Sequence, residues 1–168
     1  MSYTVQFYLV ELDKIKNVIG GKNLSIIDEI DVDDEDREYL ETLLMGTEQD
    51  EDSGSEYGYA LEKIIEQIFG ESESASAFED LHFGEFDDPA LDWIIQSGPP
   101  IKLPPNDDFP FIGHRLLADM QKALDEWDDE KLETLNDIAP EVQAKIEGML
   151  DVFQTAIEQK KDLITFYY

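Results

Sequence analysis

Basic residues are scarce in this chain. Twelve lysines and arginines stand against forty-one aspartates and glutamates, for a formal net charge of −29 over 168 residues. A protein this acidic is repelled by nucleic-acid phosphates and anionic membranes and is attracted to basic molecules. We therefore expect a basic protein partner, with no direct binding to nucleic acid or membrane. High charge also keeps a protein soluble and monomeric, so general solubility stays open as the other interpretation.

Cysteine is absent, which excludes disulfides and thiolate metal sites. No apolar run approaches the ~20 residues that span a bilayer. The first residues, MSYTVQFYLVELDKIK, lack the basic and then apolar segments of a secretory signal. We expect a soluble cytoplasmic protein whose oligomeric state the sequence leaves open.

Catalytic motifs are also missing. The two histidines, His82 and His114, do not occur at a metal-binding spacing. Neither a phosphate-binding loop nor a G-x-S-x-G turn is present. Chemistry by carboxylates alone, as in glycosidases, is not excluded by spacing. We expect no catalytic residues and no cofactor.

One acidic run resembles the start of a calcium loop, because Asp31, Asp33 and Glu35 alternate. Such a loop needs glycine at position six and glutamate at position twelve. Here these positions hold Asp36 and Thr42. We expect no dedicated metal site.

The chain is too apolar for an acidic disordered protein, with 42% hydrophobic and 11% aromatic residues. Its length fits one domain with its own core. Residues 3–10 alternate as in a strand buried mainly on one side, and residues 163–168 are also β-prone. We predict a single α+β domain over 1–168, mostly helical, with a small sheet formed by the N- and C-terminal strands.

Hydrophobic periodicity predicts the helices. Their expected ranges are 12–19, 24–30, 33–44, 57–69, 115–127, 128–138 and 140 to about 163, with a short helix or turn near 89–96. In the helix that begins at 140, one face presents Val142, Ile146, Met149, Leu150, Phe153 and Ile157.

Two loops have unusual compositions. Residues 47–56 are acidic with glycine and serine, and we expect an exposed, mobile loop. Residues 97–113 hold five of the seven prolines together with apolar side chains. We expect an ordered loop over the core, with a polyproline II ligand as the alternative.

The acids are concentrated between Asp28 and Glu56, where Arg37 is the only base. Candidate partner-binding residues are Asp31, Asp33, Asp34, Glu35, Asp36, Asp50, Glu51, Asp52 and Glu56, with Tyr57, Tyr59 and Phe86 as aromatic anchors. The first functional hypothesis is an acidic interaction module that binds a basic protein, as immunity proteins and antitoxins bind basic toxins. The alternative is a DNA mimic that inhibits a DNA-binding protein. A carboxylate-based enzyme ranks below both.

Three segments together resemble a known family. They are MSYTVQFYLVELDKIKNVIGGKN at the start, YGYALEKI at 57–64 and SGPPIKLPPNDDFPFIGH at 97–114, which contains an Asp-Phe-Pro-x-Ile-Gly-like motif. The chain is similar to a family of small bacterial proteins of unknown function. This resemblance implies an α+β fold and a bacterial cytoplasmic origin, and it transfers no functional residue.

Overall fold

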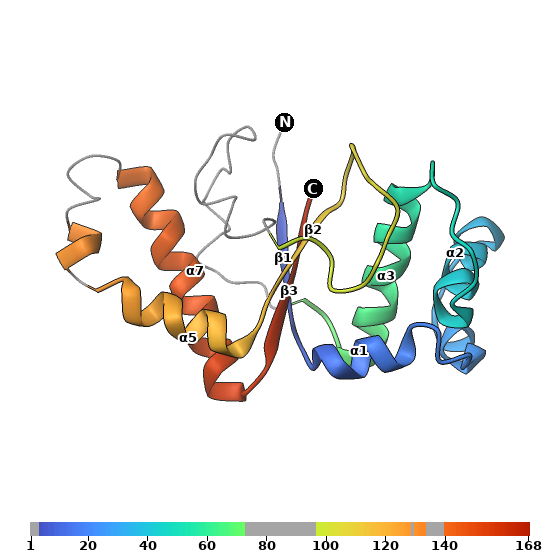
Figure 1. The fold of residues 1–168 in the computed structure, drawn as a ribbon, viewed down its shortest axis with the longest axis horizontal. Helices are drawn as coiled ribbons and strands as arrows, with labels where there is room; N and C mark the ends of the chain where they lie inside the picture. Colours follow the sequence, from blue (N-terminus) through green and yellow to red (C-terminus); the bar gives the residue numbers. More distant parts are fainter. Residues whose placement is uncertain (1–3, 73–96, 129, 134–139) are drawn as a thin grey trace.

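A three-stranded sheet stands between two groups of helices in the computed structural model, which describes residues 4–72, 97–128, 130–133 and 140–168 (Figure 1). The elements are β1 (Val5–Val10), α1 (Leu12–Val18), the 3-10 helix η1 (Leu24–Glu29), α2 (Asp34–Met45), α3 (Gly54–Phe69), β2 (Phe111–Arg115), α5 (Leu117–Glu126), α7 (Pro140–Gln159) and β3 (Asp162–Tyr167). The predicted single, mostly helical α+β domain is confirmed.

The two ends of the chain form the sheet, as predicted. The strand order is β1-β3-β2, with both neighbours antiparallel to the central strand β3. Val5 pairs with Tyr167 on one side of β3, and Phe111 pairs with the same residue on the other. β2 itself was not predicted, because its five residues lie at the junction of an expected loop and an expected helix. Proline has no backbone N–H, but the residues after Pro110 do. They can therefore pair with the free edge of β3 as a strand.

Helices cover both faces of the sheet, so the expectation of a strand buried on one side was wrong. Phe7 is 1% exposed and packs with α5 and α7, whereas Tyr8 is 3% exposed and packs with α1, α2 and α3. On β3, Leu163 and Ile164 divide between the same two cores. A sheet buried on both faces has near-continuous apolar strands. Figure 1 shows α5 and α7 on one side of the strands and α1, α2 and α3 on the other.

The termini of α2 follow their local sequence. Asp33 is the N-cap, and its Oδ1 accepts a hydrogen bond from Asp36 N at 2.9 Å. Gly46 ends the helix at φ 64°, a left-handed conformation that suits glycine. Acidic residues in the first turn also interact favourably with the helix dipole.

Three helix boundaries differ by two residues or more from those predicted. α3 begins at Gly54 instead of 57, and α5 begins at Leu117 instead of 115. α7 ends at Gln159 instead of about 163, because Lys160 turns at φ 55° and β3 follows. The apolar face predicted for α7 is confirmed, with Met149 and Phe153 buried in the core beside the sheet.

Some predictions concern residues outside the described part of the chain. These are the helix at 89–96, most of that at 128–138, and the positions of His82 and Phe86. Residues 130–133 are helical. Among the helices that the structure describes, none is long and apolar enough to cross a membrane.

Candidate functional site

The acids of the predicted partner surface form two separate groups. One group, residues 31–36, lies at the N-terminus of α2, and the other, residues 48–52, follows its C-terminus. α2 has twelve residues, which corresponds to about 18 Å at the rise of an α-helix. A run that is continuous in sequence is therefore divided in space.

One acid of the group at the start of α2 is paired with a base. Lys63 Nζ on α3 forms an ion pair with Asp36 Oδ2 and so joins α2 to α3. Arg37 lies 3.6 Å from Asp28 Oδ1 in η1 and 3.1 Å from Glu41 Oε1 in its own helix. The side chains that remain exposed are those of Asp31, Asp33, Asp34 and Glu35.

The second group lies on the loop 47–53, which we call the acidic loop. Asp50 organises it: Ser53 Oγ donates to Asp50 Oδ2 at 3.1 Å, and Asp52 N donates to Asp50 Oδ1 at 3.3 Å. Asp50 N in turn donates to the Tyr57 hydroxyl at 3.2 Å. Asp50, Glu51 and Asp52 are exposed. The loop thus has internal hydrogen bonds while its carboxylates face solvent.

The predicted aromatic anchors have different positions. Tyr57 is only 4% exposed, and its ring packs edge-on against Tyr39 at 5.1 Å. It faces α2 from the inner side of α3, so assigning it to the partner surface was wrong. Tyr59 is 42% exposed and stacks on Tyr168 at 5.8 Å. Glu56, in the first turn of α3, is exposed.

The segment 97–110, which we call the proline-rich loop, lies against the N-terminal half of α3. A Cβ atom on Gly54 would be 2.4 Å from the carbonyl oxygen of Pro105, and one on Gly58 would be 2.9 Å from Pro110 Cγ. Such distances leave no room for a side chain. The two glycines therefore permit the close approach of this helix and the loop.

Polar contacts also hold the proline-rich loop in shape. Asn106 Nδ2 donates to the Pro110 carbonyl at 3.1 Å, while its Oδ1 accepts from Asp108 N at 3.1 Å. Ser55 Oγ on α3 donates to the carbonyl oxygen of Phe109. The loop is thus fixed both internally and to the helix.

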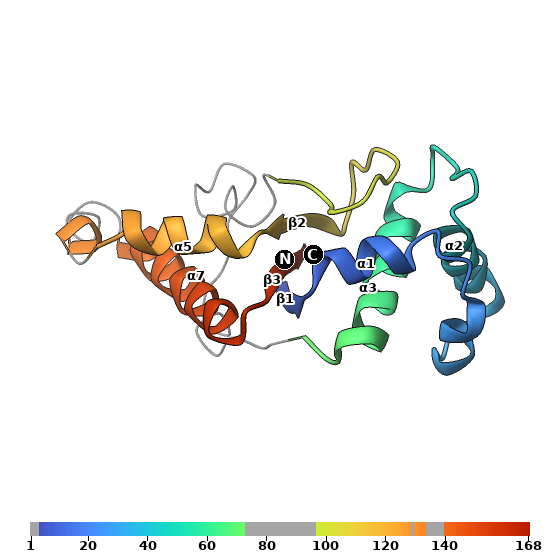
Figure 2. The same cartoon turned by 60° about the horizontal axis from the view of Figure 1, so that its bottom comes forward.

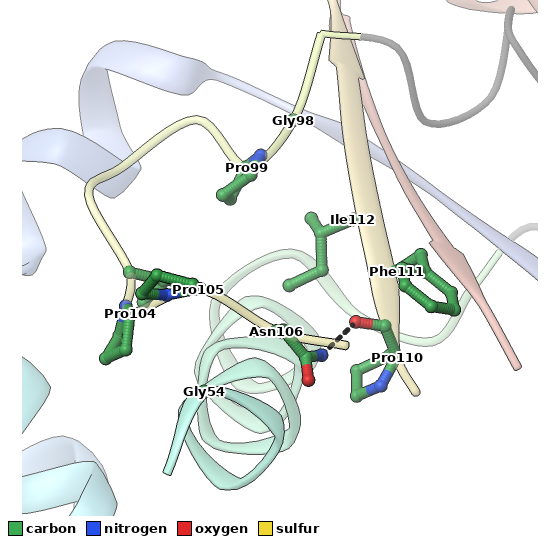
Figure 3. Close-up of a pocket in the computed structure, with 10 residues that line it drawn as sticks. Gly54, Gly98, Pro99, Pro104, Pro105, Asn106, Pro110, Phe111 and Ile112 are labelled. Atoms are coloured by element: carbon green, nitrogen blue, oxygen red, sulfur yellow. Dashed lines mark hydrogen bonds between the residues drawn. The ribbon is translucent and has the colours of Figure 1, made fainter. Parts of the chain in front are cut away.

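Between the proline-rich loop and α3 is an open hollow of about 330 Å³, which we call the apolar pocket (Figure 3). Its lining residues are Gly54, Gly98, Pro99, Leu103, Pro104, Pro105, Asn106, Pro110, Phe111 and Ile112. In Figure 3 the proline rings and Ile112 surround the hollow, and the Asn106 amide lies at its edge bonded to Pro110. Asn106 supplies the only polar side chain of this lining.

A larger groove of about 930 Å³, which we call the acidic groove, adjoins the pocket. It lies between the acidic loop and the proline-rich loop, which run side by side in Figures 1 and 2. Gln49 Nε2 joins the two loops by donating to the carbonyl of Lys102 at 3.3 Å. Its lining carries the carboxylates of Glu48, Asp50, Glu51 and Asp52 and one base, Lys102. Leu103, Pro104 and Pro105 line both hollows.

A third feature, which the sequence did not reveal, is a half-buried carboxylate on α3. Glu62 accepts hydrogen bonds from the hydroxyl of Tyr8, at 2.9 Å, and from that of Tyr168. Burial raises the pKa of Glu62 to about 7, Glu66 adds to the rise, and the Tyr8 hydrogen bond opposes it. Burial also raises the pKa of Tyr8. This cluster joins α3 to β1 and to the residue that follows β3.

The described residues contain no group of three or more histidine, aspartate or glutamate side chains placed to hold a metal ion. Fold and site together define a small acidic α+β domain with an apolar pocket beside an acidic groove. The chain belongs to a family described as a domain of unknown function (DUF7691), whose match covers residues 1–168. This confirms the resemblance to an uncharacterised family. Neither the curated proteins nor the solved structures contain a match.

Proposed function

We propose that this protein is an acidic interaction module that binds a basic protein, in the manner of an immunity protein or antitoxin. The observation that supports it is the acidic groove lying directly beside the apolar pocket. Stable interfaces combine a desolvated apolar centre with a polar rim. Charges on the rim mainly speed the encounter with an oppositely charged partner. Both parts are present here within one surface.

The acidic groove is a better candidate than the start of α2. In the described part of the chain, no ion pair engages the carboxylates of the groove, and at the start of α2 only Asp36 is paired, with Lys63. Exposed carboxylates are therefore available at both places. The groove differs because it shares Leu103, Pro104 and Pro105 with the apolar pocket, so charge and apolar surface lie together there.

A DNA mimic is the alternative function. It would need rows of surface carboxylates at the spacing of duplex phosphates, about one charge per 1.7 Å of axis. Most of the acids between Asp28 and Glu56 instead lie in two groups at opposite ends of α2, with Glu38 and Glu41 between them. This division favours the interaction module.

The test compares two triple variants with the same net charge. One neutralises the acidic loop by Glu48→Gln, Glu51→Gln and Asp52→Asn, sparing Asp50 because it organises the loop. The other neutralises exposed acids of α2 by Asp34→Asn, Glu35→Gln and Glu38→Gln. Each removes three charges from the formal −29, so an effect of total charge alone would be equal in both.

Wild-type protein is immobilised, proteins captured from a lysate of the source cells are identified by mass spectrometry, and the main captured protein is purified. Stopped-flow association is then measured at about 0.05 M and about 0.5 M NaCl, where the Debye length differs several-fold. We expect the captured protein to be basic. The loop variant should slow its association about tenfold at low salt, whereas the α2 variant should change the association rate little. Capture of acidic proteins only, or equal slowing by both variants, would contradict the proposal. A captured DNA-binding protein that duplex DNA displaces would favour the mimic.

A further inference from the structure

We infer that the apolar pocket binds one apolar side chain of an extended partner segment whose neighbouring residues are lysines and arginines lying over the acidic groove. This inference rests on the proposed function and specifies the chemistry of the partner. It concerns how the surface recognises its ligand, which the proposed function leaves open.

The size of the pocket favours a single side chain. Its volume of about 330 Å³ is at the low end of pockets that enclose small ligands. It is also open to solvent, and Leu103, Pro104 and Pro105 line both the pocket and the acidic groove. A side chain in the pocket therefore has the groove next to it, within reach of the residues that precede or follow it in the partner segment.

The lining of the pocket is held in place by its own residues. Four of its lining residues are prolines, whose φ is fixed. Gly54 lies close against the Pro105 carbonyl, and Asn106 forms hydrogen bonds with Pro110 and Asp108. A site that needs little ordering on binding loses little affinity to conformational entropy.

Charge complementarity identifies the residues that flank the apolar side chain. Along an extended segment, successive side chains are about 3.3 Å apart and point to opposite sides. Residues near the one in the pocket therefore pass along the acidic loop, with Glu48, Asp50, Glu51 and Asp52 lining the groove. Asp107 and Asp108 are also exposed, next to Asn106. Long basic side chains can reach these carboxylates while their aliphatic parts lie on the prolines.

The experiment selects ligands without assuming their sequence. A display library of random peptides is panned against the wild-type protein at about 0.15 M NaCl. The enriched peptides are synthesised with a fluorophore, and their affinities are measured by anisotropy. We expect peptides with one leucine, isoleucine, methionine or phenylalanine among several lysines and arginines.

Two neighbouring prolines provide a matched pair of variants. Pro99 lines the pocket and Pro100 does not, yet both are partly buried. Pro99→Trp should fill the pocket and weaken the selected peptides at least about tenfold, because the buried contact of one apolar side chain is lost. Pro100→Trp should change affinity less than about twofold, the range of a mere surface change. Thermal melting of both variants checks that they remain folded.

The remaining outcomes separate this inference from the proposed function. The panning could instead select basic peptides without an apolar residue. If both proline variants bind these peptides equally and the loop triple variant binds them more weakly, the pocket inference is overturned and the interaction module is still supported. Panning that enriches nothing, while a basic protein is captured whole, would likewise overturn only the pocket inference. Enrichment of acidic or uncharged peptides would overturn both.

Discussion

The two ends of α2 carry similar charge in different surroundings. At the N-terminal end, Asp33 caps the helix and Asp36 pairs with Lys63, so the acids contribute to folding. At the C-terminal end, the carboxylates lie on a loop beside an apolar pocket. Charge density alone therefore does not distinguish a structural or solvated face from a binding surface. What differs between the two ends is the apolar surface that adjoins the acids at the C-terminal end, on which the proposed function rests.

The largest effect on stability is expected from Gly54→Ala, beside the acidic loop at the C-terminal end of α2. Alanine ordinarily favours a helix over glycine by up to about 1 kcal/mol. Here the new Cβ would be 2.4 Å from the Pro105 carbonyl oxygen, and overpacking of this kind costs about 1–3 kcal/mol. Urea unfolding should therefore show a loss of stability, and anisotropy should show weaker binding of peptides selected for the pocket. Glu56→Ala, on the exposed side of the same helical turn, is the control and should be nearly neutral. A stabilised Gly54→Ala variant would refute the close approach.

At the other end of α2, replacing the N-cap by Asp33→Ala should lower the free energy of unfolding by about 1 kcal/mol. Glu51→Ala in the acidic loop should stay within about 0.5 kcal/mol of the wild type, because it is exposed and no cap depends on it. The rate of association with a basic partner should instead fall more for Glu51→Ala than for Asp33→Ala. Similar unfolding curves for the two variants would remove the distinction between a structural acid and a free one.

Glu62 gives a test of a different kind, in the pH dependence of stability, because it is an acid that the fold prefers protonated. Its pKa in the folded protein is about 7, above the ordinary value of a glutamate near 4.3. The native state therefore binds more protons in this window, and stability falls as pH rises. The stabilisation is complete below about pH 4.3 and is lost as pH rises through 7.

The measurement is the difference in unfolding free energy between wild type and Glu62→Gln at several pH values. Glutamine stays neutral, so the wild type should lose stability relative to the variant between about pH 4 and 7. Taking the difference cancels the repulsion among the other acids. A pH-independent difference would show that Glu62 titrates like an exposed carboxylate.

Local features were predictable from the sequence. Asp33 and Gly46 mark the two ends of α2, and the hydrophobic period of α7 identifies its buried face. These features could be predicted because capping and amphipathicity are local. β2 was missed because five residues form a strand only where a partner edge exists. Burial of both faces of β1 was missed because it depends on helices far along the chain.

The candidate site was harder to predict for the same reason. Gly54 and Pro105 form one pocket although about fifty residues separate them in sequence. The Glu62 cluster needs residues from α3, β1 and the end of the chain. The acidic run was visible, but its division by α2 follows from helix geometry and from ion pairs that only the fold reveals. Tyr57 was misassigned because aromatic composition does not say which side of a helix faces the core.

The central position of β3 also has a consequence for the order of folding. Val5 pairs with Tyr167, so β1 is synthesised well before the strand that it pairs with. Meanwhile α1, α2 and α3 are synthesised with no sheet to cover. Their apolar sides stay open to chaperones or to aggregation until residues 162–167 emerge, and long-range pairing of this kind folds slowly. Any chain that stops short of β3 lacks both ladders of the sheet and leaves the apolar sides of these helices uncovered.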